Sequence, residues 1–267
     1  MQAKVPEKTA RRIAVIVGSG GTSRRLLDLL PMLLGRDRAV EMQGIFLEEA
    51  EILNAAELPF VQELCRVTFS LREFNRDQFE RALALRMRSA QRALSVLARR
   101  AGVVHSFRNV RGSATQLLLE AAASADIMVF EPSRRMSAST GQVSSRAARR
   151  IAVAVADTDS GRMALRAAMH LAERRMERVT VLLAPELGRN PAAQSALFKV
   201  LPGPPGRVVT LPGAGMDDLV AAVRVAGVKL LVIAATGDVM APAGLQRLRE
   251  RLSCPVCLVR QWDEALG

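Results

Sequence analysis

A pattern of apolar and polar segments occurs twice along the chain. The apolar run at 13–17 leads into a small-residue turn and then an amphipathic stretch to residue 30, and residues 151–172 repeat this order. A short β-branched run followed by apolar residues at helical spacing predicts a strand that leads into a helix. The repeat therefore predicts two α/β units of similar plan.

Each predicted unit continues with the same elements. A second apolar strand is expected at 39–48 and at 178–185, and a strand–turn–helix–strand segment at 102–132 and at 206–238. The last strand of each segment is almost wholly apolar, which is typical of parallel strands that are covered on both faces. The pattern therefore predicts the α/β class, with two parallel-sheet units in tandem.

The two units, expected at 9–148 and 149–262, differ in two places. Unit 1 carries a long helical stretch at about 74–101, where unit 2 has a shorter segment broken by prolines. Unit 2 ends in the apolar run 255–260, a predicted fifth strand. In unit 1 a polar segment leads directly into the first strand of unit 2, so we expect unit 1 to lack a fifth strand.

Charge and composition indicate which partners and which cellular location to expect, but they do not indicate a reaction. The net charge is +12 and the pI about 11.2, but the arginines that carry it are scattered over predicted helices, which is typical of solvated helix faces. Nucleic acid is therefore not favoured as a partner. No apolar stretch reaches the roughly 18 residues of a transmembrane helix, and the start does not have the pattern of a signal peptide. We expect a cytoplasmic protein.

The order of the segments resembles that of a tandem universal stress protein (UspA-like) of the HUP type. The resemblance is carried by "GVVHSFRNVRGSATQLLLEAAASADIMVF", by "VAVADTDSGRMALRAA", and by "DDLVAAVRVAGVKLLVIAATGD" followed by "LSCPVCLVR". It covers most of the chain. It implies a stress-response protein, and because many members of the family bind ATP or another adenine nucleotide, it also implies where such a ligand would be sought.

The resemblance implies an acidic residue after the first strand, a G-x-x-G after the fourth strand and a later Gly-Ser. In unit 2 the acidic position is shifted to Asp157, and Thr236 and Gly237 remain of the glycine loop, which has lost its first glycine. In unit 1 Gly18 replaces the acidic residue and Glu131 stands at the first loop glycine, where a carboxylate repels phosphate. We therefore expect degenerate nucleotide sites.

The stretch "GSGGTS" after the first strand allows two interpretations. Backbone N–H groups of a glycine-rich turn at a helix start can bind an anion, and the candidate residues are Gly18, Gly20, Gly21, Thr22 and Ser23. The spacing matches neither a full G-x-G-x-x-G nor a P-loop. The alternative is an ordinary strand-to-helix turn in which Ser23 or Thr22 caps the helix.

The chain shows no arrangement typical of a catalytic or metal site. Cys254 and Cys257 form a C-x-x-C, but β-branched residues follow them and the remaining length is too short for the helix of a redox site. A zinc site would need a second pair of ligands, whereas Cys65, His105 and His170 are isolated. We interpret the cysteines as structural and expect neither enzymatic activity nor a bound metal.

Two functions remain open at this point. The first is a regulatory or partner-binding protein with degenerate nucleotide sites and an unknown protein partner. The second is an adenine-nucleotide sensor that keeps one working site. In either case we predict a homodimer in which Val256–Val259 pair at an exposed sheet edge, because unit 1 offers no strand to cover it. Three leucines on the preceding helix would add apolar area: Leu245, Leu248 and Leu252.

Overall fold

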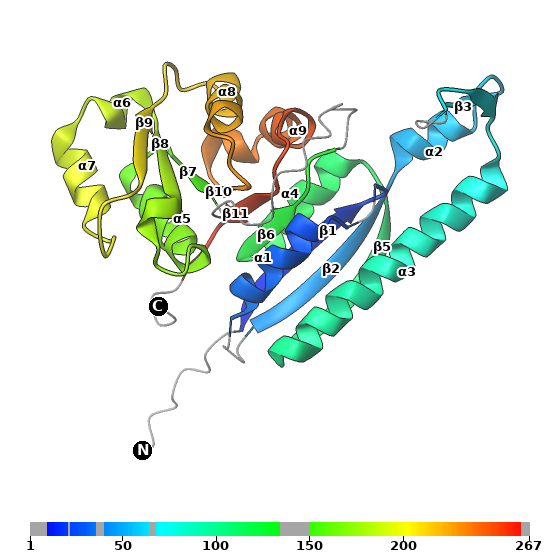
Figure 1. The fold of residues 1–267 in the computed structure, drawn as a ribbon, viewed down its shortest axis with the longest axis horizontal. Coiled ribbons are helices and arrows are strands. Elements are labelled where there is room, and N and C mark those ends of the chain that lie inside the picture. The colour runs from blue at the N-terminus through cyan, green and yellow to red at the C-terminus, as the bar shows by residue number, and fades with distance from the viewer. Residues whose placement is uncertain (1–9, 21, 36–39, 65–67, 134–149, 263–267) are drawn as a thin grey trace.

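The computed structural model describes residues 10–20, 22–35, 40–64, 68–133 and 150–262. They form an α/β protein around one nine-stranded sheet of order β5-β2-β1-β6-β11-β10-β7-β8-β9 (Figure 1). The nine strands fall into two parallel groups, one of four and one of five, joined by an antiparallel pairing between β6 and β11. The predicted class, a mostly parallel sheet in two units, is confirmed.

Unit 1 supplies four strands of the sheet, in the order β5-β2-β1-β6. Residues 134–149 lie outside the described part, so the absence of a fifth strand in unit 1 stays a prediction. The predicted long helix is α3, which spans 26 residues and ends on Gly102 in the left-handed conformation. The elements of this unit are β1 (Arg11–Gly18), α1 (Arg24–Leu34), β2 (Val40–Glu49), α2 (Ala50–Ala56), β3 (Gln62–Leu64), β4 (Leu71–Glu73), α3 (Arg76–Ala101), β5 (Val104–Gly112), α4 (Ala114–Ser124) and β6 (Ile127–Phe130).

Unit 2 supplies the other five strands, in the order β11-β10-β7-β8-β9. Its second crossover contains only two short helices, because prolines interrupt the segment. The elements are β7 (Ile151–Val155), α5 (Thr158–Leu171), the 3₁₀ turn η1 (Met176–Arg178), β8 (Val179–Leu183), α6 (Pro185–Gly188), α7 (Pro191–Phe198), β9 (Arg207–Thr210), α8 (Met216–Ala226), β10 (Leu230–Ala234), the 3₁₀ turn η2 (Gly237–Met240), α9 (Pro242–Arg251) and β11 (Val256–Val259).

Strand β11 joins the two units and corrects the predicted dimer contact. It pairs in parallel with β10 and antiparallel with β6, so both of its edges are used within one chain. All four residues Val256–Val259 are at most 1% exposed. The prediction that they form an exposed, dimer-forming edge is wrong. Among the described residues, no strand of unit 1 lies on that side of β6, and β11 occupies the position instead.

The three helical leucines proposed for the same contact are also buried inside the chain. Leu245, Leu248 and Leu252 pack in the core between the sheet and helices α4, α8 and α9. They do supply apolar area beside β11, as expected, but to the chain's own core. A homodimer therefore stays a prediction that needs another surface, and the unit boundaries stay predictions as well.

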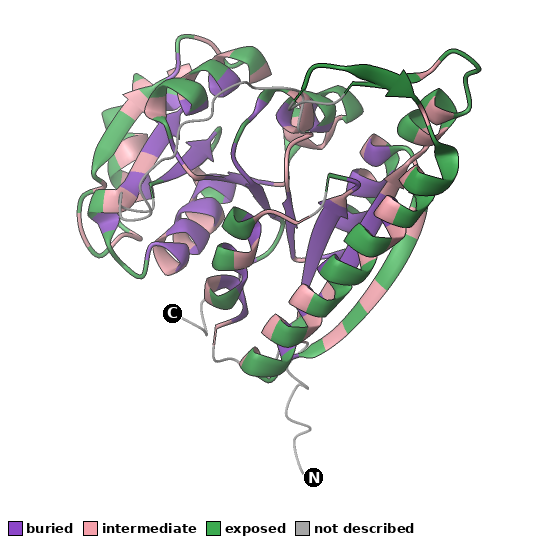
Figure 2. Ribbon diagram, turned by 45° about the vertical axis from the view of Figure 1, so that its right-hand side comes forward, coloured by how far each residue is buried: buried purple, intermediate pink, exposed green. Residues whose placement is uncertain are grey.

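Helices cover both faces of the sheet, as continuous apolar strands require. Helices α1, α3, α5 and α7 pack on one face, and α4, α8 and α9 pack on the other. Successive strand residues alternate between these two cores: Ile13 and Val15 belong to the first, Ala14 and Ile16 to the second. Figure 2 shows the strands at the centre of the sheet as the most buried part of the molecule.

One segment leaves the body of the molecule. Between β2 and α3 the chain forms α2 and the short hairpin β3–β4, which stand at the end of the sheet farthest from unit 2 (Figure 1). No residue of α2, β3 or β4 is buried, and the hairpin is exposed throughout in Figure 2. This arm, residues 50–73, has no counterpart in the sequence prediction.

Candidate functional site

The topology defines one crevice in each unit where a ligand of an α/β sheet is expected. The order in which strands are added to the sheet reverses between β1 and β6 in unit 1, and between β7 and β10 in unit 2, although both pairs are parallel. Ligands of open α/β sheets bind beyond the carboxyl ends of the strands at such a switch point. Because β11 runs antiparallel to β6, the carboxyl ends of the two units face opposite edges of the sheet. The predicted loop residues of units 1 and 2 therefore belong to two separate sites.

In unit 1 the crevice is occupied by a carboxylate of the chain itself. Gly18 ends β1, and Ser23 is the N-cap of α1, with its hydroxyl accepting from the Leu26 N–H at 3.2 Å. Glu131, directly after β6, accepts from the Ser23 N–H at 3.0 Å through Oε2 and from the Ser23 hydroxyl through Oε1. The Ser23 donors are thus already bound to an anion, at the point where a phosphate would approach the helix.

The start of this loop is held by an arginine of α3. Arg86 of α3 donates to the Ser19 carbonyl at 2.9 Å, and Ser19 is buried. A Cβ on Gly20 would meet no atom within 4 Å, whereas one on Gly18 would lie 3.5 Å from the Glu49 carboxylate. Thr22 has a buried hydroxyl without a hydrogen-bond partner in the described structure. Gly21 lies outside the described residues.

A second carboxylate at this edge is neutralised across the two units. Glu49, at the end of β2, forms an ion pair with Arg249 of α9, and both side chains are only 15% exposed. The Arg249 carbonyl accepts from the Ser133 N–H at 2.7 Å. Of the two glutamates at the carboxyl edge of unit 1, Glu49 is thus paired with a cation, and the Glu131 carboxylate is the one that disfavours a phosphate there.

In unit 2 the acidic candidate also caps its own helix. Asp157 is the N-cap of α5 and accepts from the N–H groups of Asp159 at 3.0 Å and Ser160 at 2.8 Å, and from the Ser160 hydroxyl. Burial acts to raise the pKa of Asp157, but these hydrogen bonds outweigh it and lower the pKa below its ordinary value. The carboxylate is thereby kept charged at the helix start.

Thr236 and Gly237 lie beside Asp157, because β7 and β10 are neighbours in register. Gly237 adopts the left-handed conformation with φ of +51° and opens the turn η2. That turn packs tightly on α9, since a Cβ on Gly244 would lie 2.0 Å from the Asp238 carbonyl. The three candidates thus follow the ends of two neighbouring strands, but the loop after Gly237 is folded back onto α9.

The two cysteines of the C-x-x-C point into different cores. Cys257 lies in β11 among the residues that face α1 and α5, whereas Cys254, just before the strand, packs among those that face α8 and α9. Burial raises the pKa of Cys254 to about 11 and that of Cys257 to about 12. Both thiols are free and buried, as a structural role requires. Among the described residues, no group of three His, Cys, Asp or Glu side chains could hold a metal.

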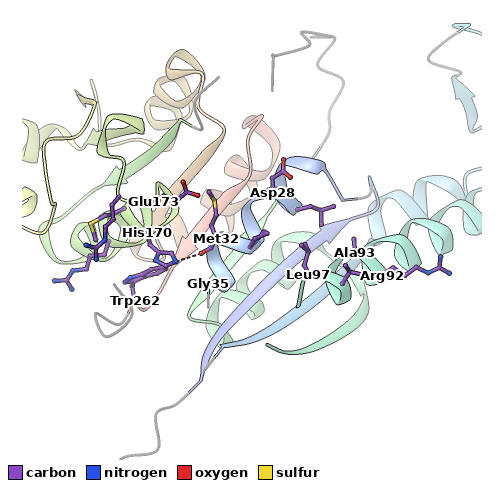
Figure 3. Close-up of a pocket in the computed structure, with 15 residues that line it drawn as sticks. Asp28, Met32, Gly35, Arg92, Ala93, Leu97, His170, Glu173 and Trp262 are labelled. Atoms are coloured by element: carbon purple, nitrogen blue, oxygen red, sulfur yellow. Dashed lines mark hydrogen bonds between the residues drawn. The ribbon is translucent and has the colours of Figure 1, made fainter. Parts of the chain in front are cut away.

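A groove lies elsewhere in the described structure. It has a volume of about 1100 Å³, runs between α1, α3 and α5 and reaches Trp262 after β11 (Figure 3). Its walls are mainly apolar, and five charged side chains line it. The apolar residues are Leu27, Pro31, Met32, Val96, Leu97, Met169 and Trp262, and the charged ones are Arg92, Arg166, Arg174, Asp28 and Glu173.

One end of the groove is fixed by a contact between the units. His170 of α5 donates from Nε2 to the Met32 carbonyl of α1 at 2.9 Å, as Figure 3 shows, and its ring lies 5.4 Å from that of Trp262. The Arg11 guanidinium stacks on the Trp262 ring, and its central carbon lies 4.4 Å from the ring centroid. Burial lowers the pKa of His170 below its ordinary value, and the positive charges of Arg11 and Arg174 lower it further. The hydrogen bond to the Met32 carbonyl acts in the opposite direction and raises it, but does not outweigh the other effects.

The sequence analysis missed this groove. Its walls come from three helices and a residue near the chain's end, and each helix reads separately as an ordinary amphipathic element. The one available signal was the single tryptophan, Trp262, in a chain with 3% aromatic residues. Aromatic residues are enriched at binding surfaces, so its position after the last strand was informative.

Comparison with solved structures finds a universal stress protein from Archaeoglobus fulgidus DSM 4304. It is 11% identical with a TM-score of 0.48, and the match covers 94% of this chain and 97% of that chain. No protein-family model matches the chain, and no curated protein does. A likeness at this level concerns the fold only, so the proposals below rest on the residues of this chain. None of the helices described here is long and apolar enough to cross a membrane.

Proposed function

We propose that this is a regulatory, partner-binding protein of the universal-stress type, with degenerate nucleotide sites, which acts without catalytic turnover. The observation that carries the proposal is the contact of Glu131 with Ser23 at the start of α1. It places a fixed negative charge in the crevice of unit 1 where the family would bind phosphate.

Magnitudes favour exclusion of the nucleotide. A helix N-terminus stabilises an anion by about 0.3–1 kcal/mol, and by about 2 kcal/mol in favourable cases. Two like charges about 4 Å apart repel by roughly 4 kcal/mol at an effective dielectric constant of 20. A phosphate beside Glu131 would therefore lose more from the carboxylate than it gains from the helix. Displacing Glu131 would also cost its hydrogen bonds to Ser23.

The groove between α1, α3 and α5 is the surface that we assign to the partner. It combines apolar walls with three arginines and two acidic residues, so it suits a segment that is apolar on one side and acidic on the other. An amphipathic helix laid in such a groove buries its apolar face and pairs its carboxylates with arginines. Val96 and Arg92, on the outer side of α3, would meet that segment first.

The nucleotide part of the proposal is tested by equilibrium binding of labelled ATP, ADP and AMP, together with mass spectrometry of any nucleotide released when the purified protein is denatured. We expect no copurified nucleotide and no saturable binding at millimolar concentration. The Glu131→Ala variant should bind adenine nucleotides more tightly than the wild type, because the loop donors become free. Binding to the wild type that Glu131→Ala leaves unchanged contradicts the proposal.

The partner surface is tested with the fluorescence of Trp262, the only tryptophan of the chain. The probe is a helix-forming peptide with leucine on one face and glutamate on the other, and the control peptide carries lysine in place of glutamate. The acidic peptide should shift the emission, and Arg92→Glu should abolish that shift. Equal responses to both peptides, or none to either, would remove the groove from the proposal.

The alternative, a nucleotide sensor, is supported by one observation. Gly237 keeps a left-handed turn after β10 with open space around its Cα, beside Asp157. If the sensor hypothesis holds, ATP binds the wild type, and Gly237→Val abolishes this binding while Gly20→Val does not. If the loop of unit 1 is the working site, Gly20→Val abolishes ATP binding and Gly237→Val leaves it unchanged.

A further inference from the structure

The arm, residues 50–73, exposes large apolar side chains that the fold does not use. Five residues on α2–β3–β4 and their connections are between 42% and 91% exposed: Leu58, Phe60, Leu64, Phe69 and Leu71. Phe69 also has a φ of +54°, a conformation that bulky residues rarely adopt. An apolar group of this size on a monomer is typical of an interaction surface.

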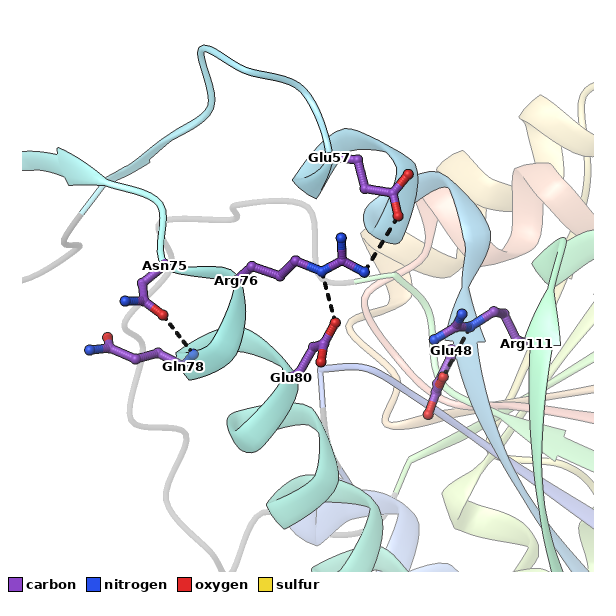
Figure 4. Close-up of polar contacts among 7 residues, drawn as sticks. All are labelled: Glu48, Glu57, Asn75, Arg76, Gln78, Glu80 and Arg111. Atoms are coloured by element: carbon purple, nitrogen blue, oxygen red, sulfur yellow. Dashed lines mark hydrogen bonds and ion pairs between the residues drawn. The ribbon is translucent and has the colours of Figure 1, made fainter.

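The hairpin of the arm is too small to be stable by itself. Strands β3 and β4 have three residues each and pair only with one another. A two-stranded hairpin is marginal in water unless another layer covers it. At the base, the arm is held to α3 by the exposed ion pair of Arg76 with Glu57, at 3.7 Å, beside the helix pair Arg76–Glu80 (Figure 4). Within the described residues, the five exposed side chains named above belong to neither hydrophobic core.

Charge distinguishes the arm from the rest of the molecule. Residues 50–73 carry four glutamates and two arginines, a formal charge of −2, so the remainder of the chain carries +14. Two bodies with that charge repel each other. At the arm the repulsion is smallest, and both signs are present: Glu63 and Arg72 form an ion pair at 2.8 Å. This pairing leaves the surface of the hairpin locally neutral, so a second arm meets little charge repulsion there.

We propose that the arm packs against the arm of a second copy of this chain, which forms a twofold dimer. The five side chains offer roughly 600 Å² of apolar surface per copy, because an exposed phenylalanine alone offers about 150–250 Å². A standard stable interface buries about 600–1000 Å² per partner. The same patch on both copies satisfies the self-complementarity that a twofold contact needs. The arm projects from the body, so two arms meet without contact between the basic bodies (Figure 1).

Sedimentation velocity over a concentration series tests the dimer. The wild type should be a dimer at tens of micromolar and dissociate on dilution. The variant Phe60→Asp with Phe69→Asn should weaken the dimer at least about a hundredfold, since buried aromatic residues dominate such contacts. Asparagine suits the positive φ at position 69. Because both phenylalanines are exposed in one chain, 91% and 75%, the variant should keep the wild-type Tm at concentrations where both are monomers.

Val225→Asp is the matched control, because Val225 is 82% exposed on α8, outside the arm. It should leave the dimer unchanged. A wild-type monomer at tens of micromolar overturns the proposal. So does a dimer that persists in the arm variant, or one that the control variant weakens equally.

Discussion

At the scale of single residues, the main feature is that the candidate ligand-binding groups are bound to each other. Ser23 is the N-cap of α1, which the sequence analysis offered as the alternative to anion binding, and it also donates to Glu131. Asp157 caps α5 in the same way. In both units the start of a helix is satisfied by a carboxylate of the chain, so a phosphate would compete with a ligand already in place.

The buried cysteines lead to the first residue-scale prediction. With a pKa of about 11 or higher, fewer than about one Cys254 or Cys257 thiol in a thousand is ionised at pH 8. In a Cys65→Ser background, neither should react with a thiol reagent in the native state, and both should react at the rate of global unfolding. Stoichiometric zinc, or a reversible disulfide between the two, would show that the pair has a chemical role.

His170 leads to the second. Because its folded-state pKa lies below the ordinary value of 6.5, the unfolded chain binds the proton first as the pH falls. Its contribution to stability is complete above about pH 6.5 and is lost as the pH falls through the lowered folded-state pKa. The Tm of the wild type should therefore fall more steeply from pH 7 to pH 5 than that of His170→Gln.

His105, the other histidine, is on the edge strand β5, and His105→Gln serves as the control. It should show the wild-type dependence on pH. If the two variants follow the same curve, the contact of His170 with Met32 does not link the two units.

At the scale of elements, strand β11 decides how the two units are joined. It fills the position between β6 and β10, and its side chains enter both cores. The sequence analysis predicted this strand and its neighbours because apolar runs of four or five residues are clear signals. It placed the strand at an open edge, because pairing between units depends on which partner lies beside it in space, and no local pattern encodes that.

The burial of β11 gives a prediction for its stability. Leu258→Ala should lower the free energy of unfolding by about 2–5 kcal/mol, because Leu258 is 1% exposed and the substitution leaves a cavity. Val225→Ala, at an 82% exposed position, should change it by less than about 0.5 kcal/mol. Urea unfolding monitored by circular dichroism measures both. A Leu258→Ala protein of wild-type stability would place β11 outside the core.

The arm shows where elements could not be predicted. Between residues 50 and 73 apolar and charged residues alternate without a helical or strand period, and six large apolar side chains of the described residues are exposed. Prediction from pattern assumes that apolar residues are buried within the chain. Where apolar residues are exposed, as in the arm, their spacing along the sequence no longer indicates which segments form helices or strands.

At the scale of the whole molecule, the antiparallel pairing of β6 and β11 makes the strands of the two units run in opposite directions. Their carboxyl edges face opposite directions, and the groove forms where helices α1 and α5 of different units meet over the sheet. The two units were predictable from the repeated pattern, whereas the groove was not, because its walls are distant in sequence. In the described part of the chain, a carboxylate therefore binds the helix start in each crevice, while the groove and the arm stay open to a partner.

The central claim is that these crevices are filled by the chain's own carboxylates. It is tested most directly by the backbone amide signals of Ser23 and Ser160 in ¹H–¹⁵N NMR spectra during titration with ATP. Both N–H groups are bound, to Glu131 and Asp157. The account predicts that millimolar ATP leaves both signals in place in the wild type and moves that of Ser23 in Glu131→Ala. A saturable shift of either signal in the wild type would contradict it.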